Sequence, residues 1–237
     1  MKKAIAGVLG LCAFLYAAPI EGRVSEAAGE RIVASLPGAK VGQSAIVLYR
    51  YEGGEAISRE CVVADADRGE LICRPFEQFD QDSVPKVILP VKPGDRVIAG
   101  PLSATALIIA PSAGRYVRVQ DRHKNYRFIH PDLFAAQLTK ADNPVPKTEA
   151  FKTFCDAWMV GTLIFALKDG DWIVDCQSFT ALAFHADTPV TEEAAKPFYH
   201  RLDPIERGFF SWGTPKTIAD FDAHYQSLIQ KEFHAQR

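Results

Sequence analysis

Residues 57–74 read Ile-Ser-Arg-Glu-Cys-Val-Val-Ala-Asp-Ala-Asp-Arg-Gly-Glu-Leu-Ile-Cys-Arg. Two apolar-rich runs enclose a turn that contains Asp and Gly, and this is the pattern of a β-hairpin. The turn is centred near Asp67, so Cys61 and Cys73 are expected to lie opposite each other, within reach of a cross-strand disulfide. The stretch therefore predicts a β-rich first half that is clipped by a disulfide.

More short apolar runs surround this hairpin. They are separated by turns that contain Gly or Pro, and they occupy residues 45–51, 86–90, 96–99 and 105–110. Several short strands between such turns are typical of a small β-barrel or sandwich. We therefore expect a β-rich domain over residues 19–111.

Beyond Pro111 the sequence mixes helical and strand patterns. The alternation of apolar and polar residues over 115–120 predicts a half-buried strand. Pro131 suits the first turn of one helix, and a second helix is expected after Pro146. Asp169-Gly170 between two apolar runs predicts a hairpin.

The expected fold class is α+β. The second domain, residues 112–237, should carry two helices packed on an antiparallel sheet. A C-terminal helix should dock on this body, because four apolar residues recur at helical spacing: Ile218, Phe221, Tyr225 and Leu228.

The first residues have the pattern of a secretory signal peptide. Lys2 and Lys3 precede an uncharged, mostly apolar stretch that ends in small residues. At roughly 15 residues this stretch is shorter than the ~20 that a membrane-spanning helix needs. We expect residues 1–18 to be a signal peptide, and the alternative is an uncleaved N-terminal anchor. The mature chain is then exported to the periplasm or the cell surface, without an integral membrane segment.

Removal of residues 1–18 would take away Cys12 and leave four cysteines in the exported chain. Because disulfides persist in oxidising compartments, these four are expected to form disulfides. Four cysteines allow three pairings, and the spacing favours Cys61 with Cys73. Cys155 with Cys176 would then tie a predicted helix to a neighbouring strand. Buried free thiols in a reducing cell are the alternative. Neither pair has the CxxC spacing that favours zinc or thioredoxin-like chemistry.

The composition argues against an intrinsically disordered, a collagen-like or a coiled-coil protein. Hydrophobic residues make up 48% of the chain and charged residues 24%, which is ordinary for a globular protein. Lys and Arg total 27 against 29 for Asp and Glu. Nothing in this balance favours a nucleic-acid partner, which would call for a basic excess.

The sequence predicts no catalytic, cofactor-binding or metal site. It contains neither GxSxG nor the Gly-rich phosphate motifs. His130 and Asp132 stand at a helix start, but side chains two positions apart do not share a helix face, so we assign them to capping and packing. Four carboxylates flank predicted turns and are expected to be solvated: Asp65, Asp67, Asp169 and Asp171. Other histidines are scattered without a metal-binding spacing.

Five stretches in this order resemble a known bacterial family. They cover residues 42–47 (Gly-Gln-Ser-Ala-Ile-Val), 94–98, 106–111, 129–136 (Ile-His-Pro-Asp-Leu-Phe-Ala-Ala) and 174–179 (Val-Asp-Cys-Gln-Ser-Phe). The chain is similar to the N-terminal domain of the plasminogen-binding protein PgbA family, from about Ala34 to Leu228. The stretch at 129–136 is the most specific of the five.

The resemblance implies an exported, non-enzymatic protein of the cell envelope that binds another protein, with host plasminogen as the named partner. Plasminogen's kringle pockets capture lysine: an anionic centre pairs with the ammonium and aromatic walls cover the stem. Lys231 is a weak candidate for this contact. The alternative function is a periplasmic structural or scaffold protein of an envelope or flagellar-motor assembly, whose contact surface would be apolar and aromatic. An enzyme whose site residues are distant in sequence ranks third.

Overall fold

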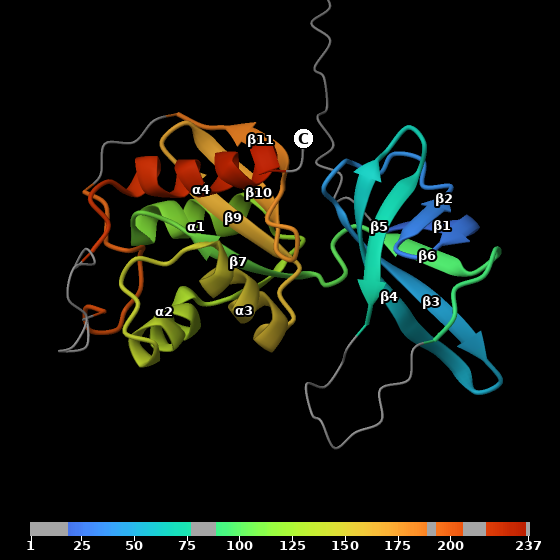
Figure 1. Ribbon diagram of the computed structural model, residues 1–237. Coiled ribbons are helices and arrows are strands. Elements are labelled where there is room, and N and C mark those ends of the chain that lie inside the picture. The colour runs from blue at the N-terminus through green and yellow to red at the C-terminus, as the bar shows by residue number, and fades with distance from the viewer. Residues whose placement is uncertain (1–18, 77–88, 189–192, 206–216, 236–237) are drawn as a thin grey trace, which may run out of the picture.

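The protein consists of two lobes that lie side by side (Figure 1). The computed structural model describes residues 19–76, 89–188, 193–205 and 217–235, and the side chains of residues 230–235 are not described. The predicted signal peptide lies outside these residues. The first lobe is a closed barrel and the second a sheet with helices on both faces.

The barrel contains six antiparallel strands in the order β1-β2-β5-β4-β3-β6. Their bounds are Ile20–Ala28 (β1), Arg31–Ala34 (β2), Ser44–Tyr51 (β3), Gly54–Asp65 (β4), Glu70–Pro75 (β5) and Arg96–Ala99 (β6). Alternate residues point inward, so that Val47, Val63 and Val97 belong to one core of mostly small apolar side chains. The predicted β-rich barrel is confirmed.

The cysteine hairpin forms as its sequence predicts. Cys61 in β4 is the register partner of Cys73 in β5, and the two are joined by a disulfide. In the turn, the Asp65 carboxylate accepts hydrogen bonds from the main-chain N–H groups of Asp67 and Arg68. Gly69 has a φ of 66°, and a side chain there would collide with the carbonyl of Ala34, so glycine is required.

The second lobe contains a five-stranded sheet in the order β11-β10-β9-β7-β8. The strands are Thr105–Ile109 (β7), Arg127–Ile129 (β8), Thr162–Leu167 (β9), Gly170–Asp175 (β10) and Ala181–Ala186 (β11). The helices are Ala113–Arg122 (α1), Pro131–Lys140 (α2), Thr148–Trp158 (α3) and Phe221–Ala235 (α4). The predicted α+β class, the helices at 131 and 148, the 169–170 hairpin and the C-terminal helix are confirmed.

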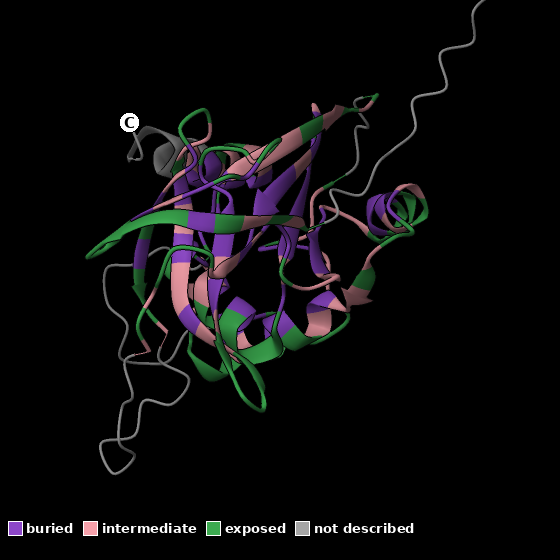
Figure 2. Ribbon diagram, turned by 90° about the vertical axis from the view of Figure 1, so that its right-hand side faces the viewer, coloured by how far each residue is buried: buried purple, intermediate pink, exposed green. Residues whose placement is uncertain are grey.

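The sheet is mixed, which corrects the expected antiparallel arrangement. β7 runs parallel to both β8 and β9, because helices connect these strands and return the chain to the same edge. Only β10 and β11 continue the sheet by antiparallel pairing. Figure 2 shows buried residues along the strands, with buried and exposed stripes on the helices.

The domain boundary also differs from the expected residue 111. The strand at Thr105–Ile109 lies in the second sheet, between β9 and β8, and takes no part in the barrel. The boundary therefore falls between the end of β6 at Ala99 and the start of β7. The sequence of a short apolar stretch indicates that a strand is present, but it does not indicate which sheet the strand joins.

The predicted strand at 115–120 was wrong, because these residues form helix α1. Ser112 caps the helix: its hydroxyl accepts a hydrogen bond from the Arg115 N–H at 3.1 Å. The buried positions Tyr116, Val119 and His123 follow a helical spacing, and Val117 is exposed. Six residues that alternate between polar and apolar are too few to distinguish the strand period from the helical period, unless the helix cap before them is also recognised.

The second disulfide joins Cys155 in α3 to Cys176, the residue after β10. Both cysteines are fully buried in a core of aromatic rings contributed by α2, α3, α4 and the sheet. Among them, Phe151 packs against Phe134, Phe165 and Tyr225, with ring centroids 4.7–6.2 Å apart. The bridge thus ties α3 to the strand end, as the sequence predicts.

A buried carboxylate connects the two lobes. Asp175, at the end of β10, accepts hydrogen bonds from the main-chain N–H and the hydroxyl of Ser44 in the barrel, at 3.0 and 2.6 Å. It also accepts from the N–H groups of Gln177 and Ser178. The Ser178 hydroxyl in turn donates to the carbonyl of Gly42 at 2.5 Å. We call Gly42, Ser44, Asp175 and Ser178 the lobe junction.

We predict that Asp175→Asn destabilises the protein by about 2 kcal/mol, because the new amide group would face the Ser44 N–H and leave buried donors opposed. The measurement is the midpoint of urea unfolding. Asp121→Asn is the matched control, since the Asp121 side chain is 71% exposed. Equal midpoints for the two variants would contradict the structural role of the junction.

We also predict that peptide mapping without reduction finds Cys61 linked to Cys73 and Cys155 linked to Cys176. Reduction should lower the free energy of unfolding by about 2–4 kcal/mol per bridge, chiefly by releasing the unfolded chain. Protein that is reduced and alkylated before digestion is the control for the peptide mapping, and its cysteine peptides should not be linked. Free thiols at these positions in protein recovered from an oxidising compartment would contradict the prediction.

Candidate functional site

The carboxyl ends of β7 and β8 lead to helices on opposite faces of the sheet. β7 leads to α1, whose Tyr116 packs with Ile108 on one face, and β8 leads to α2, whose Phe134 packs with Leu107 on the other. In open sheets of parallel strands, ligands bind outside the carboxyl ends of the strands at the point where the strand order reverses, which is β7 in the order β9-β7-β8. We call this place the switch-point edge.

The protein's own chain lies across the switch-point edge. The main-chain N–H of Ala195 donates to the carbonyl of Pro111, and that of Tyr199 donates to the carbonyl of Ala110, both at 2.8 Å. The segment from Ala195 to Tyr199 therefore covers the carboxyl end of β7. The position that holds a small ligand in other sheets is filled here by backbone and side chains of the same chain.

Three aromatic rings from different segments meet at this edge. The ring of Tyr116 lies 5.3 Å from that of His130 and 5.8 Å from that of Tyr199, centroid to centroid. His130 and Tyr199 lie 6.3 Å apart. At these separations the rings pack against one another. Burial raises the pKa of the Tyr116 hydroxyl. The result is a packed aromatic surface.

His130 caps α2 as the sequence predicts, and its ring also lies close to the Asp132 carboxylate. The His130 Nδ1 accepts a hydrogen bond from the Asp132 N–H at 3.2 Å and lies 3.1 Å from the Asp132 carboxylate. The two side chains meet because His130 precedes the helix. Asp132 also accepts from the main-chain N–H and the guanidinium of Arg201. Burial acts to raise the pKa of Asp132, but the Arg201 hydrogen bonds outweigh it and lower that pKa.

The outer side of this cluster carries apolar and cationic groups exposed to solvent. Leu133 and Leu202 are each next in the chain to a member of the Asp132–Arg201 ion pair, and they are 41% and 44% exposed. The Arg201 side chain is 64% exposed. Tyr and Arg are enriched in protein interfaces, whereas Lys is depleted. We call His130, Leu133, Tyr199, Arg201 and Leu202 the switch-point surface.

A second set of charged side chains lies beneath α1, with Arg115 and Asp171 buried and Arg122 and Asp187 partly exposed. Arg115 Nη2 lies 2.7 Å from Asp171 Oδ1, and Arg122 Nη1 lies 2.5 Å from Asp171 Oδ2. Both arginines also contact Asp187, Arg122 at 2.7 Å. His123 Nε2 lies 3.2 Å from Asp171. Two guanidinium groups are thus matched by two carboxylates, and together they hold α1 against β10 and the residue after β11.

The expectation that Asp171 is a solvated turn carboxylate was wrong. β10 begins at Gly170, so Asp171 is a strand residue, and it is fully buried facing α1. Asp67, in contrast, is exposed in its turn. Sequence reasoning missed this cluster, although Arg115 and Arg122 are seven positions apart and share a face once α1 is recognised as a helix.

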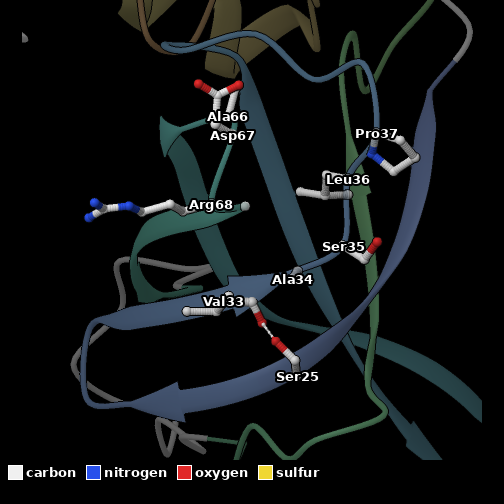
Figure 3. A pocket seen from close by; sticks show the side chains of 10 residues that line it. Ser25, Val33, Ala34, Ser35, Leu36, Pro37, Ala66, Asp67 and Arg68 are labelled. Carbon is white, nitrogen blue, oxygen red and sulfur yellow. Dashed lines mark hydrogen bonds between the residues drawn. The ribbon is translucent and has the colours of Figure 1, made fainter.

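A hollow of about 410 Å³ lies on the barrel, beside the β4–β5 turn (Figure 3). The Ser25 hydroxyl donates to the carbonyl of Val33 within it. Figure 3 shows the side chains of Asp67 and Arg68 pointing in different directions. Its walls are mainly backbone and small side chains: Ser25, Val33, Ala34, Ser35, Leu36, Pro37, Ala66, Asp67, Arg68 and Gly69. The hollow does not gather polar groups around a common point.

The other sequence-predicted residues are placed as follows. Lys231 lies in α4, but its side chain is outside the described part of the structure. Within the described residues, no group of three or more His, Cys, Asp or Glu side chains is arranged to hold a metal ion. Among those same residues, no helix combines the length and apolar character needed to cross a membrane.

The buried charge cluster predicts how stability depends on acid. Burial acts to raise the pKa of Asp187, but hydrogen bonds from Arg122, the Thr188 N–H and Arg115 outweigh it and lower that pKa to about 2, from an ordinary value of 3.8. Because the folded pKa is the lower one, the carboxylate stabilises the fold above pH 3.8, and this stabilisation is lost as the pH falls toward 2.

We therefore expect the stability difference between wild type and Asp187→Asn to be constant above about pH 4 and to shrink toward pH 2. Urea unfolding at a series of pH values measures it. Asp121→Asn, at an exposed position, is the control and should differ little from wild type throughout. A difference that does not change with pH would show that Asp187 is not held ionised by the arginines.

Four of the five stretches that carry the family resemblance lie at the lobe junction or at the switch-point edge. Stretches 42–47 and 174–179 meet at the lobe junction. Stretches 106–111 and 129–136 form the switch-point edge. Stretch 94–98 leads into β6, where the Gly94 N–H donates to the carbonyl of Val24.

Comparison with known proteins identifies the family of the chain. No curated protein matches the chain. The family model described as "Plasminogen-binding protein pgbA N-terminal" matches residues 20–229, which include both lobes. The chain therefore belongs to the family of plasminogen-binding protein PgbA N-terminal domains.

Proposed function

We propose that this protein is an exported binding module of the cell envelope that acts through protein–protein contact and without catalysis. The switch-point surface carries the proposal, because it joins exposed leucines to an arginine and aromatic rings at the edge where sheets of this kind bind ligands. The crevice itself is covered by the segment from Ala195 to Tyr199. A flat partner surface fits this edge better than a small substrate.

Two further features support export. The disulfides Cys61–Cys73 and Cys155–Cys176 suit an oxidising compartment. Residues 1–18 have the sequence pattern of a signal peptide. Periplasm and cell surface are both compatible with these features.

The family description makes host plasminogen the first partner to test. A kringle pocket takes a lysine ammonium against an anionic centre and aromatic walls. Contact of this kind would use Lys231 or another exposed lysine. It would not use the switch-point surface, whose exposed cation is Arg201.

The second candidate function is a structural protein of an envelope or flagellar-motor assembly. A specific observation favours it: the switch-point surface is apolar and aromatic, and Leu133, Tyr199 and Leu202 belong to it. Such a surface suits a long-lived contact with another envelope protein. It offers a kringle pocket no lysine.

Plasminogen capture is tested with the immobilised protein and purified plasminogen. We expect saturable binding that a soluble lysine analogue displaces, and we expect Lys231→Ala to weaken binding several-fold, as the loss of a charge-assisted contact does. Arg68→Ala is the matched control, because the Arg68 side chain is 81% exposed and is not a lysine. Binding that persists in excess lysine analogue would rule out kringle capture, and absence of binding would remove plasminogen as the partner.

The switch-point surface is tested in cells by placing a photo-crosslinking residue at position 202. We expect a discrete adduct with an envelope protein. We expect Arg201→Glu to reduce the yield of this adduct at least about fivefold, because reversal of the charge on the surface removes its electrostatic complementarity to the partner. The same residue at position 72 is the control, since Ile72 is 45% exposed on the barrel. Equal adducts from both positions would contradict the proposal.

A further inference from the structure

Three arginines gather on the outer face of the barrel, on strands that lie side by side. Arg23 in β1 is the direct register partner of Arg96 in β6. Arg50 lies near the end of β3, the other neighbour of β6. Like charges directly opposite each other in an antiparallel pair are destabilising. This part of the barrel therefore carries a local cost that its neighbours offset only in part.

The nearest carboxylates are taken up by Arg96. Its Nε and Nη2 donate to Glu21 at 3.2 and 2.7 Å, and its Nη1 donates to Glu55 at 2.8 Å. The hydrogen bond from Arg96 and its charge lower the pKa of Glu21, so this carboxylate stays ionised beside it. Arg96 thus forms ion pairs with both carboxylates, which fix its position.

Arg23 and Arg50 keep unused donors. Arg23 Nη1 donates to the carbonyl of Gly94 at 2.9 Å, and within the described residues it forms no ion pair. Arg50 contacts Glu55, already bound to Arg96, through a single contact of 3.3 Å. Its side chain is 76% exposed. Two guanidinium groups are therefore available for a further partner.

All three arginines border one hollow. It has a volume of about 370 Å³ and is lined by Glu21, Gly22, Arg23, Arg50 and Arg96. With Glu55 included, three cations face two anions, which leaves one positive charge. The guanidinium group presents paired donors in a plane, a geometry that matches two oxygens of a phosphate or a carboxylate.

Three other barrel arginines differ from this set. Each of them pairs with a carboxylate of its own: Arg31 with Glu70, Arg68 with Asp65, and Arg74 with Glu60. These are ordinary solvated surface pairs. Arg59 forms no ion pair within the described residues and instead donates to the carbonyls of Ser58 and Leu89. What distinguishes the hollow is therefore that three arginines gather there around two carboxylates.

We propose that this hollow binds a phosphate group, with Arg23 and Arg50 as its ligands and Arg96 as the positioned third cation. A phosphate has enough oxygens to contact guanidinium groups from two strands at once, and its charge of −1.5 to −2 near pH 7 exceeds that of a carboxylate. A free phosphate or phosphomonoester carries this charge, and the phosphodiester headgroup of an anionic phospholipid carries a single negative charge but still presents two free oxygens to guanidinium groups. The proposal is independent of the protein partner discussed above.

The test titrates the purified protein with inorganic phosphate and follows the Arg side-chain N–H signals by NMR. We expect saturable shifts and at least about tenfold weaker binding for Arg23→Gln/Arg50→Gln, since charge-assisted hydrogen bonds are lost. Arg31→Gln/Arg74→Gln is the matched control and should bind like wild type. Thermal unfolding of both variants verifies that each is folded.

A second arm separates the two sources. Vesicles of phosphatidylglycerol are compared with vesicles of phosphatidylcholine. Binding of phosphatidylglycerol that is lost in Arg23→Gln/Arg50→Gln supports the headgroup, and binding of inorganic phosphate without vesicle binding supports a soluble ligand. No saturable binding of either probe, or equal binding by the two variants, would overturn the proposal.

Discussion

The buried carboxylate of Asp175 holds the two lobes in one arrangement. At the end of β10 it accepts hydrogen bonds from the N–H groups of Gln177 and Ser178. It also accepts two hydrogen bonds from Ser44, the first residue of β3. Removal of any partner would leave a donor or an acceptor unsatisfied in a dry junction, which costs more than the bond itself contributes. The next residue, Cys176, is tied to α3 by a disulfide. The strand end is therefore fixed from both sides.

This constraint reaches the switch-point edge through β10. Asp171, four residues before Asp175 on the same strand, anchors Arg115 and Arg122 of α1. The same helix carries Tyr116 into the aromatic cluster with His130 and Tyr199. Breaking of buried ion pairs is strongly destabilising, so α1 has little freedom to shift. The switch-point surface is thus presented on a rigid support, which lowers the entropy lost when a partner binds.

Local features could be predicted from the sequence and distant ones could not. The cysteine hairpin was predictable because its turn and both strands lie within residues 57–74. The helices at 131 and 148 were predictable from their first turns. The parallel order of β7, β8 and β9 and the pairing of Arg201 with Asp132 join residues far apart in sequence, and no local pattern encodes them. α1 was missed because its cap, Ser112, lies just outside the alternating run.

Charge is arranged in two different ways in the two lobes, and the difference carries functional information. Beneath α1 the two arginines meet two carboxylates, because an unmatched charge in a buried site is costly. On the barrel, solvent tolerates an unmatched charge, so the fold does not dictate that Arg23 lacks a carboxylate while Arg31 and Arg74 have one. Complete matching in the interior is explained by stability alone. Stability does not require three arginines to gather around one exposed hollow, and a bound anion would account for their grouping.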